Sequence, residues 1–587
     1  MGLVFRSHFP KRPSREVRIG RTAVGGENPV RIQSMLTSDT MDTAACVAET
    51  LPLVAEGCEI VRVTAPTVKD ARNLERIRAV LNEKGCDIPL VADIHFKPDA
   101  ALEAAKWIEK VRINPGNFAD SKKFHVREYS DVEYAAEIDR IKDRFAPLVL
   151  LCKDRGIAMR IGTNHGSLSD RIMNRFGDTP AGMVESAIEF ARIARTLGFH
   201  DFVFSMKASN PKVMIHAYRL LVAHLDELDR TDGGGWNYPI HLGVTEAGDG
   251  EDGRIKSAIG IGSLLADGIG DTIRVSLTED ARHEIPVAKA LAEIAIRRSP
   301  SPEMRKWPFD PFTYSRRASL RMDVGEFSLG GGELVRVVVR RDVFDKVEHK
   351  LDGLGDYRPE IVFEDAGIVE LDPSDEHAVT RVNALRHPAL VAVINGCKLP
   401  VIGAYRLLAS VLDEKHPILL KDTLATGSGN FLQNLLRAAT NIGSLLCDGI
   451  GDAVLVQGEK APGQSLRIAY NTLQAAGVRI FKTDYVACPS CGRTLFNLQE
   501  TTARIKAATS HLKGVKIAIM GCIVNGPGEM ADADFGYVGG APGKVNLYVG
   551  KKPVKFNIPQ GEAVDRLVDL IHEHGRWVEP QGVTESA

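Results

Sequence analysis

Three cysteines near the C-terminal end have the spacing of a metal centre. Cys488 and Cys491 form a C-x2-C pair in CPSCGR, and Cys522 follows an apolar run in MGCIVNGPGE. Two thiolates two residues apart can bind one centre from a turn, and a third thiolate from another loop can complete the set. In a 4Fe-4S cluster this leaves one iron without a thiolate, and Glu529 is near enough in sequence to be its oxygen ligand. The pattern therefore predicts a metal-binding cluster with one exchangeable iron.

A structural zinc site is the alternative, because a C-x2-C pair is also typical of zinc. Zinc would need a fourth ligand, for which His511 is the nearest candidate. The other six cysteines stand in apolar segments without partner spacing, so we expect them to be small buried packing residues. They are Cys46, Cys58, Cys86, Cys152, Cys397 and Cys447.

The composition excludes several classes of protein. A chain of 587 residues is too long for one hydrophobic core, and its net charge of -2 gives no general attraction to nucleic acid or membrane. No apolar run approaches the roughly 20 residues of a membrane span. An odd number of thinly spread cysteines favours a reducing compartment. We expect a cytoplasmic protein with a small-molecule partner, or a protein of the plastid stroma if the source is a plant or alga.

The cysteines follow a long α/β region. Eight β-rich runs alternate with helical segments from residue 30 to about 298, which predicts a TIM (β/α)8 barrel, with a doubly wound sheet as the alternative. Functional residues of such a barrel lie where its strands end. Polar residues do occur at these ends: Arg62, Asp93, Arg112, Asn114, Arg160, Asn164, Lys207, Thr245, Glu246, Arg274 and Ser276.

Four of these residues are arginines and one is a lysine. Any one of them alone could equally form a salt bridge at the rim of the barrel. Together they place so much positive charge at one mouth that an anion is needed to offset it. The strand ends therefore predict a binding site for a small diphosphate.

An internal repeat organises the next stretch. IGSLLADGIGDTIRVS at 261–276 returns as IGSLLCDGIGDAVLVQ at 442–457, with eleven of sixteen positions identical. The second copy keeps the glycines and apolar residues, whereas Lys207, Glu246, Arg274 and Ser276 become Ile394, Leu424, Leu455 and Gln457. We therefore expect three domains: the barrel at 1–299, an inserted, degenerate barrel-like α/β domain at 300–470 with a structural or spacer role, and a small α+β module at 471–587. A second ligand site in the insert is the alternative, with Lys421 and Asp422 as its only candidates.

Several long motifs occur together in this chain. RIGTNHGSLSD, SMKAS, HLGVTEAG and GDTIRVSLT lie in the barrel region, and CPSCGR and GCIVNGPGE lie in the module. In these motifs, over about residues 15–300 and 470–560, the chain closely resembles the 4-hydroxy-3-methylbut-2-enyl diphosphate synthases of the methylerythritol phosphate isoprenoid pathway. The insert is similar to that of the larger form of the family.

The resemblance implies an iron-sulfur oxidoreductase with a sulfite-reductase-like cluster domain. Its reaction would be the reductive ring opening and dehydration of 2-C-methyl-D-erythritol 2,4-cyclodiphosphate, with ferredoxin or flavodoxin as electron donor. The cluster ligands fall on Cys488, Cys491, Cys522 and Glu529, and Glu246 and Glu529 are the catalytic candidates. The diphosphate ligands fall on the four arginines, Lys207 and Ser276. The other strand-end residues, Asp93, Asn114, Asn164 and Thr245, match those that hold the carbon skeleton.

Three questions stay open at this level. The module could cap its own barrel or that of a partner in a homodimer, and the insert could be a spacer or a platform for the donor. His95 and His165 could touch the substrate or support its ligands. A different functional class also remains, namely a non-redox, pterin-binding-like transferase that carries a structural zinc module.

Overall fold

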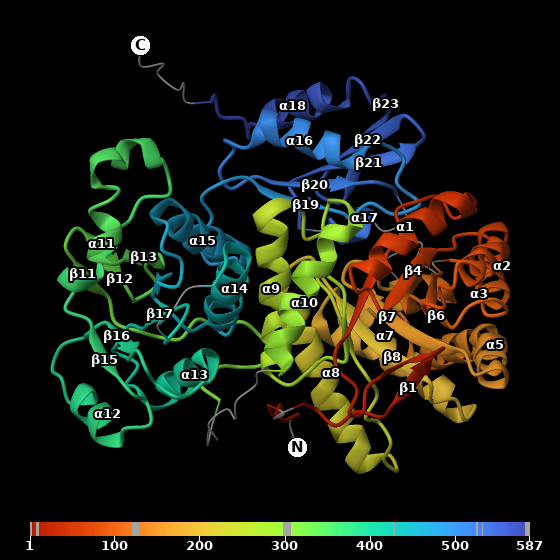
Figure 1. Ribbon diagram of the computed structural model, residues 1–587, viewed down its shortest axis with the longest axis horizontal. Helices are drawn as coiled ribbons and strands as arrows, with labels where there is room; N and C mark the ends of the chain where they lie inside the picture. Colours follow the sequence, from red (N-terminus) through yellow and green to blue (C-terminus); the bar gives the residue numbers. More distant parts are fainter. Residues whose placement is uncertain are drawn as a thin grey trace.

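The computed structural model describes residues 3–7, 11–94, 96–119, 128–296, 307–425, 429–523, 526–530 and 532–580. His95 and residues 297–306 lie outside the described residues. A barrel, a second α/β unit and a small C-terminal module are arranged so that the module lies across the top of the barrel and the second unit lies beside it (Figure 1).

The N-terminal unit is a TIM barrel, and the eight predicted strands are confirmed. Their order in the parallel sheet is β8-β7-β6-β5-β4-β3-β10-β9, and a parallel bridge between Phe204 and Ile240 joins its two ends. The strands are β3 (Arg31–Met35), β4 (Ile60–Thr64), β5 (Leu90–Asp93), β6 (Lys110–Ile113), β7 (Ala158–Asn164), β8 (Phe202–Lys207), β9 (His241–Leu242) and β10 (Thr272–Ile273).

Helices surround this barrel, and a hairpin closes its lower end. The hairpin β1 (Val17–Ile19) and β2 (Thr22–Val24) packs its apolar side chains against the first inward-facing residues of several strands. The helices are α1 (Thr43–Ala55), α2 (Val68–Glu83), α3 (Pro98–Ala104), α4 (Pro115–Phe118), α5 (Asp131–Arg155), α6 (Asp170–Phe176), α7 (Pro180–Thr196), α8 (Pro211–Thr231), α9 (Gly250–Ala266) and α10 (Glu284–Ile296). Because the hairpin covers the end of the barrel where the strands begin, only the end where the strands finish is available for a site.

The inserted unit is an open copy of the same barrel. A hairpin, β11 (Met322–Val324) and β12 (Phe327–Leu329), again precedes its parallel strands, whose order is β14-β13-β18-β17-β16-β15. This order repeats β4-β3-β10-β9-β8-β7 of the barrel, and the described residues include no counterparts of β5 and β6. The strands are β13 (Arg336–Val339), β14 (Ile361–Val362), β15 (Val369–Leu371), β16 (Val391–Val393), β17 (Leu419–Lys421) and β18 (Ala453–Leu455).

The two units pack through their repeated helices. The insert has α11 (Arg341–Phe344), α12 (Glu376–Asn383), α13 (Val401–Val411), α14 (Phe431–Cys447) and α15 (Pro462–Ala475), and α14 lies along α9 (Figure 1). The repeat-equivalent hydroxyls of Ser263 and Ser444 are 2.6 Å apart. A Cβ on Gly262 would lie 2.4 Å from the Thr440 hydroxyl, so the contact requires a glycine there.

A buried ion-pair cluster lies at one end of this contact. Arg219 of α8 and its repeat equivalent Arg406 of α13 each bind both Asp267 and Asp448, which are themselves repeat equivalents. All four side chains are at most 3% exposed. The insert therefore meets the barrel with approximate two-fold symmetry.

The C-terminal module is a mixed five-stranded sheet with two helices on one face. Its order is β19-β20-β21-β22-β23, parallel for the first three strands and antiparallel for the rest. The elements are β19 (Asp484–Ala487), α16 (Leu498–Thr509), β20 (Lys516–Met520), α17 (Gly526–Glu529), β21 (Phe535–Ala541), β22 (Lys544–Val549), β23 (Lys552–Pro559) and α18 (Ala563–Glu573). The module thus combines helices with a mixed sheet, as its predicted α+β class requires.

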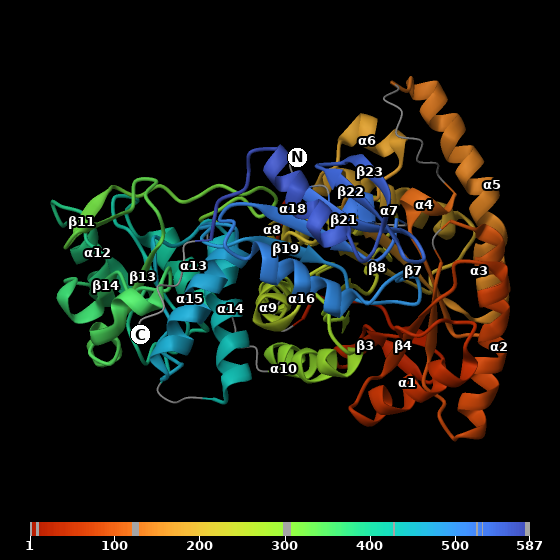
Figure 2. The ribbon, with the colours of Figure 1, turned by 90° about the horizontal axis from the view of Figure 1, so that it is seen from above.

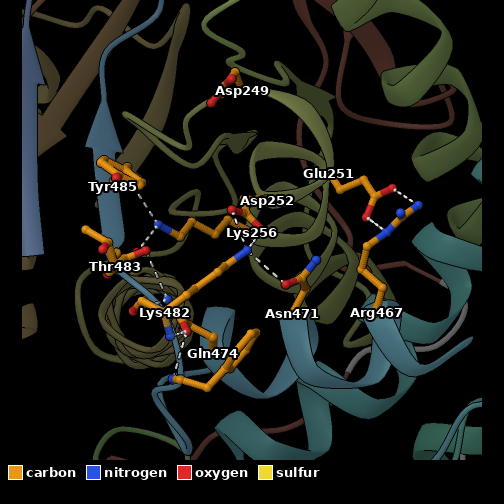
Figure 3. Close-up of polar contacts among 12 residues, drawn as sticks. Asp249, Glu251, Asp252, Lys256, Arg467, Asn471, Gln474, Lys482, Thr483 and Tyr485 are labelled. Carbon is orange, nitrogen blue, oxygen red and sulfur yellow. Dashed lines mark hydrogen bonds and ion pairs between the residues drawn. The ribbon is translucent and has the colours of Figure 1, made fainter. Parts of the chain in front are cut away.

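All three units meet at the start of α9. Glu251 pairs with Arg467 of α15, Asp252 pairs with Lys482 just before β19, and Lys256 donates to Asp484 and to the Tyr485 carbonyl (Figure 3). Seen from above, the module spans the junction of barrel and insert (Figure 2). The module thus caps the barrel of its own chain. No helix in the described ranges is long and apolar enough to cross a membrane.

Candidate active site

A cavity of about 70 Å³ lies between the barrel mouth and the module. It is lined by all the predicted site residues except Asn114 and Arg160. The lining residues are Met35, Arg62, Asp93, Arg112, Asn164, Lys207, Thr245, Glu246, Arg274, Ser276, Cys488, Pro489, Cys491, Arg493, Met520, Cys522, Gly526 and Glu529. Residues separated by hundreds of positions in the chain therefore share one cavity.

Carboxylates hold the cationic side chains in place. Arg112 donates to Asp93 at 3.0 Å and to the Gly162 carbonyl at 2.9 Å, and Arg274 pairs with Glu284 at 3.1 Å. Arg62 contacts the Met35 sulfur through Nη2 at 2.7 Å. These arginines and Lys207 are at most 7% exposed. The mouth is a positioned set of donors for an anion.

Two glycines leave the space that these long side chains occupy. A Cβ on Gly162 would lie 2.8 Å from Arg112 Nε, and one on Gly243 would lie 2.8 Å from Lys207 Nζ. Both glycines face the barrel interior, two residues before Asn164 and Thr245 respectively, because alternate residues of a strand share one face. These two glycines were not among the predicted site residues, although their positions two residues before predicted ligands could have indicated them.

Two glutamates line the cavity in contact with each other. Glu529 of α17 accepts a hydrogen bond from Asn164 Nδ2, and Glu246 follows Thr245 in a left-handed backbone conformation with a φ of 49°. Burial, followed by the charge of Glu529, raises the pKa of Glu246 well above its usual 4.5. The protonated form of Glu246 is therefore favoured, and its strained backbone is typical of a functional site.

The cysteines come from two loops that end neighbouring parallel strands. Cys488 and Cys491 follow β19, Cys522 follows β20, and the Gly521 N–H donates to Cys488 Sγ at 3.1 Å. A Cβ on Gly492 would lie 2.7 Å from the Ser38 carbonyl and the Thr64 hydroxyl. Within the described residues, no three Cys, His, Asp or Glu side chains are placed to bind a single metal ion. Three thiols and one carboxylate around a cavity are nevertheless the donor set that a cubane cluster with one non-cysteine position requires.

Close backbone contacts hold these loops against the barrel. Thr278 Oγ1 donates to the carbonyls of Ala487 and Cys488, at 3.2 and 3.1 Å. Gly166 and Gly528 meet so closely that a Cβ on Gly166 would lie 1.9 Å from the Gly528 carbonyl, and the φ of Gly166 is +77°. The contact with Gly166 explains why position 528 of the GPGE sequence is a glycine.

Arg493 also lines the cavity, although the sequence patterns did not predict it there. It is the last residue of CPSCGR, and its side chain is 12% exposed, with Nη2 3.8 Å from Asp93. A cation beside the cysteines could have been found from its place in the motif. Met35 and Met520 were missed because an apolar side chain gives no signal of a polar site.

The remaining candidates lie elsewhere. Asn114 caps α4 by accepting from the Gly116 N–H at 3.3 Å, and Arg160 is fully buried inside the barrel. His165 Nε2 lies 3.1 Å from the Asp178 carbonyl, so this ring contacts the rim rather than the cavity. None of these three residues lines the cavity among the described residues.

The insert engages its own candidates internally. Lys421 pairs with Glu370 and donates to the Val393 carbonyl at 2.9 Å. Asp422 accepts from the Gln457 N–H at 2.8 Å and from the Gly458 N–H. These contacts give both residues a structural role, and neither lines the cavity between barrel and module.

Comparisons with known proteins identify the family. Residues 14–289 match the model described as GcpE TIM-barrel domain, and residues 484–573 match that of the GcpE protein C-terminal domain. The 4-hydroxy-3-methylbut-2-en-1-yl diphosphate synthase (flavodoxin) of Akkermansia muciniphila is 60% identical, over 98% of both chains. The chain belongs to this synthase family.

Other members are similar over most of their length. The synthase (flavodoxin) of Leptospira interrogans is 45% identical over 97% of this chain and 98% of its own. The chloroplastic synthase (ferredoxin) of Oryza sativa is 43% identical over 97% of this chain and 88% of its own. Among solved structures, the dihydropteroate synthase of Vibrio fischeri covers 49% of this chain and all of its own at 10% identity, with a TM-score of 0.31 that is too low to support an argument.

Proposed function

We propose that this synthase converts 2-C-methyl-D-erythritol 2,4-cyclodiphosphate into (E)-4-hydroxy-3-methylbut-2-enyl diphosphate. The reaction consumes two electrons and two protons, opens the ring and releases one water. The observation that supports it is the single cavity, because it joins an arginine-lined anion site to three cysteines. Family membership and the names of the relatives agree with this activity and do not favour a pterin-binding-like transferase with a zinc module.

The barrel mouth is suited to bind and orient the diphosphate. Arg62, Arg112, Arg274 and Lys207 offer charge-assisted hydrogen bonds from several strands, and Ser276 adds a hydroxyl. Asp93, Asn164 and Thr245 line the same cavity and can form hydrogen bonds with the hydroxyl groups of the carbon skeleton. Binding from several sides fixes the ring so that its C–O bond faces the module.

We assign Cys488, Cys491 and Cys522 as ligands of a 4Fe-4S cluster, with Glu529 as the fourth ligand before substrate enters. Such a cluster supplies electrons singly at low potential. The Gly521 N–H donates to Cys488 Sγ, which is the kind of contact that tunes a cluster potential. Asn164 orients the Glu529 carboxylate through its hydrogen bond.

Glu246 is the proposed proton donor to the departing hydroxyl. Its raised pKa favours the protonated form, and Glu529 is the second group able to move a proton in the cavity. Closure by the module excludes water, since the lining residues of the mouth are almost fully buried.

The electron donor is assigned from the relatives. Their names specify flavodoxin, or ferredoxin for the rice protein, and we propose one of these carriers for this chain. The domain limits remain those expected from sequence, except that α15 runs through Ala475, so we place the end of the insert there. A homodimer and a cytoplasmic location, or the plastid stroma for a plant source, remain predictions.

Anaerobic purification followed by a turnover assay tests this function. We expect a brown protein with about four irons per chain that forms the allylic diphosphate when reduced flavodoxin or ferredoxin is supplied. A colourless protein that holds one zinc and forms no product would refute the assignment.

A further inference from the structure

A second layer of polar residues lies beneath the cavity, inside the barrel. Lys110 is two residues before Arg112 on β6, so both side chains face the interior. Arg160 stands beside Arg112 in the register of β6 and β7. Lys110 and Arg160 are 0% exposed, and among the described residues neither Lys110 Nζ nor any guanidinium nitrogen of Arg160 has a hydrogen-bond partner.

Neutral polar side chains complete this layer. All are at most 1% exposed, and each has side-chain polar atoms without a hydrogen-bond partner in the described part of the chain. They are Gln33 of β3, Ser205 of β8, His241 of β9 and Thr272 of β10. Buried polar groups almost always find partners, so a cluster of unpartnered ones on six neighbouring strands points to a role in binding.

The charges that face Lys110 are positive. Arg62 and Arg160 are its charged neighbours, and His241 lies within the same group with Lys207 above it. The interior carboxylates are already engaged, Asp93 by Arg62 and Arg112, and Glu284 by Arg274. Glu246 and Glu529 belong to the mouth. No carboxylate of the described interior is therefore left for Lys110.

A lysine differs from an arginine in such a place. The guanidinium groups stay charged, whereas burial and the charges of Arg160 and Arg62 lower the pKa of Lys110 well below its usual 10.5. An added diphosphate reverses this balance, because its negative charge favours the ammonium form.

We propose that Lys110 forms the floor of the anion site and takes up a proton from solvent when a diphosphate binds above it. Lys110 is then a positioning residue, since it acts on the diphosphate through Arg160 and the arginines of the mouth. The inference deepens the proposed function and depends on it only for the identity of the diphosphate. Without the diphosphate, Lys110 stays neutral and the barrel interior holds one positive charge fewer. When the diphosphate binds, Lys110 gains the proton and supplies that charge.

Calorimetry of the full chain with inorganic pyrophosphate tests the proposal. Titrations at one pH in PIPES and in Tris, whose ionisation enthalpies differ, give the number of protons taken up. Lys110→Met should take up about one proton fewer than the unaltered chain. Its affinity should be about tenfold weaker, because one buried positive charge below the anion is lost. Lys142→Met, on the exposed face of α5, is the matched control and should change neither value.

Two outcomes would overturn the proposal. One is equal proton uptake and equal affinity in Lys110→Met and the unaltered chain. If Lys110→Met does not fold, Lys207→Met decides, since it removes the other lysine of the described interior and leaves Lys110 in place. When it is saturated with pyrophosphate, Lys207→Met must still take up a proton, and saturation without proton uptake contradicts the role of Lys110. Pyrophosphate binding needs no turnover, so failure of the proposed reaction and failure of this inference remain distinguishable.

Discussion

Replacement of Arg406 by methionine should loosen the contact between insert and barrel. Arg406 donates to Asp267 at 2.6 Å and to Asp448 at 2.9 Å, and the only other partner of these carboxylates in the cluster is Arg219. Both carboxylates are 0% exposed. Arg406→Met leaves two buried negative charges against one positive charge. Loss of one partner from a buried ion pair costs about 3 to 5 kcal/mol, a factor of roughly 150 to 4,000 in an equilibrium.

Hydrogen exchange read by mass spectrometry measures this effect at the contact itself. A chain of three units does not unfold in a single two-state step, so the exchange of amides in α9 and α14 is a better observable than one melting temperature. We expect faster exchange in these two helices, and unchanged exchange in β20 and β21 of the module.

The double variant Arg406→Met/Asp448→Asn separates charge balance from lost packing. It leaves Arg219 with Asp267 as a neutral pair, so it should recover about 2 kcal/mol or more of the loss. Arg381→Met, at an exposed position of α12, is the control. Equal exchange in the single and double variants would refute the reasoning, as would a single variant that exchanges like the unaltered chain.

Four further changes test the site. Glu529→Ala should keep about four irons per chain because three thiolates remain, while turnover falls steeply; loss of all iron would contradict its role. Arg274→Leu should raise KM and leave the iron content unchanged, and a normal KM would remove this residue from the anion site. Gly162→Ala should raise KM by about tenfold, since the added methyl group displaces Arg112 and overpacking costs about 1 to 3 kcal/mol; a normal KM would show that the side chain shifts freely. Lys256→Met should speed amide exchange in β19, and exchange at the normal rate would show that this ion pair does not hold the module.

Much of the architecture follows from the sequence. Strand runs such as KVRIN and DFVFSMK alternate with helical segments and end in polar residues, so both the barrel and its polar mouth could be predicted. The repeat also predicted that the insert is barrel-like. Its missing counterparts of β5 and β6 could not be predicted, because a short unmatched segment gives no pairing information.

The candidate site was predicted less completely than the fold. Charged and thiol side chains stand out in a sequence. Gly162 and Gly243 matter because they have no side chain, which leaves room for Arg112 and Lys207. The place of Arg160 beneath the cavity depends on the register between β6 and β7, which side-chain type does not fix. Lys110 was missed for the same reason, since it begins a strand and lies one layer below the strand ends.

The two-fold contact between α9 and α14 affects how this protein responds to dilution. A contact between separate chains weakens as their concentration falls, whereas two surfaces within one chain meet at an effective concentration set by the linker. The insert therefore stays packed against the barrel, and the module stays over the mouth, even at nanomolar protein concentrations. Activity per chain should accordingly be constant over a wide range of concentrations.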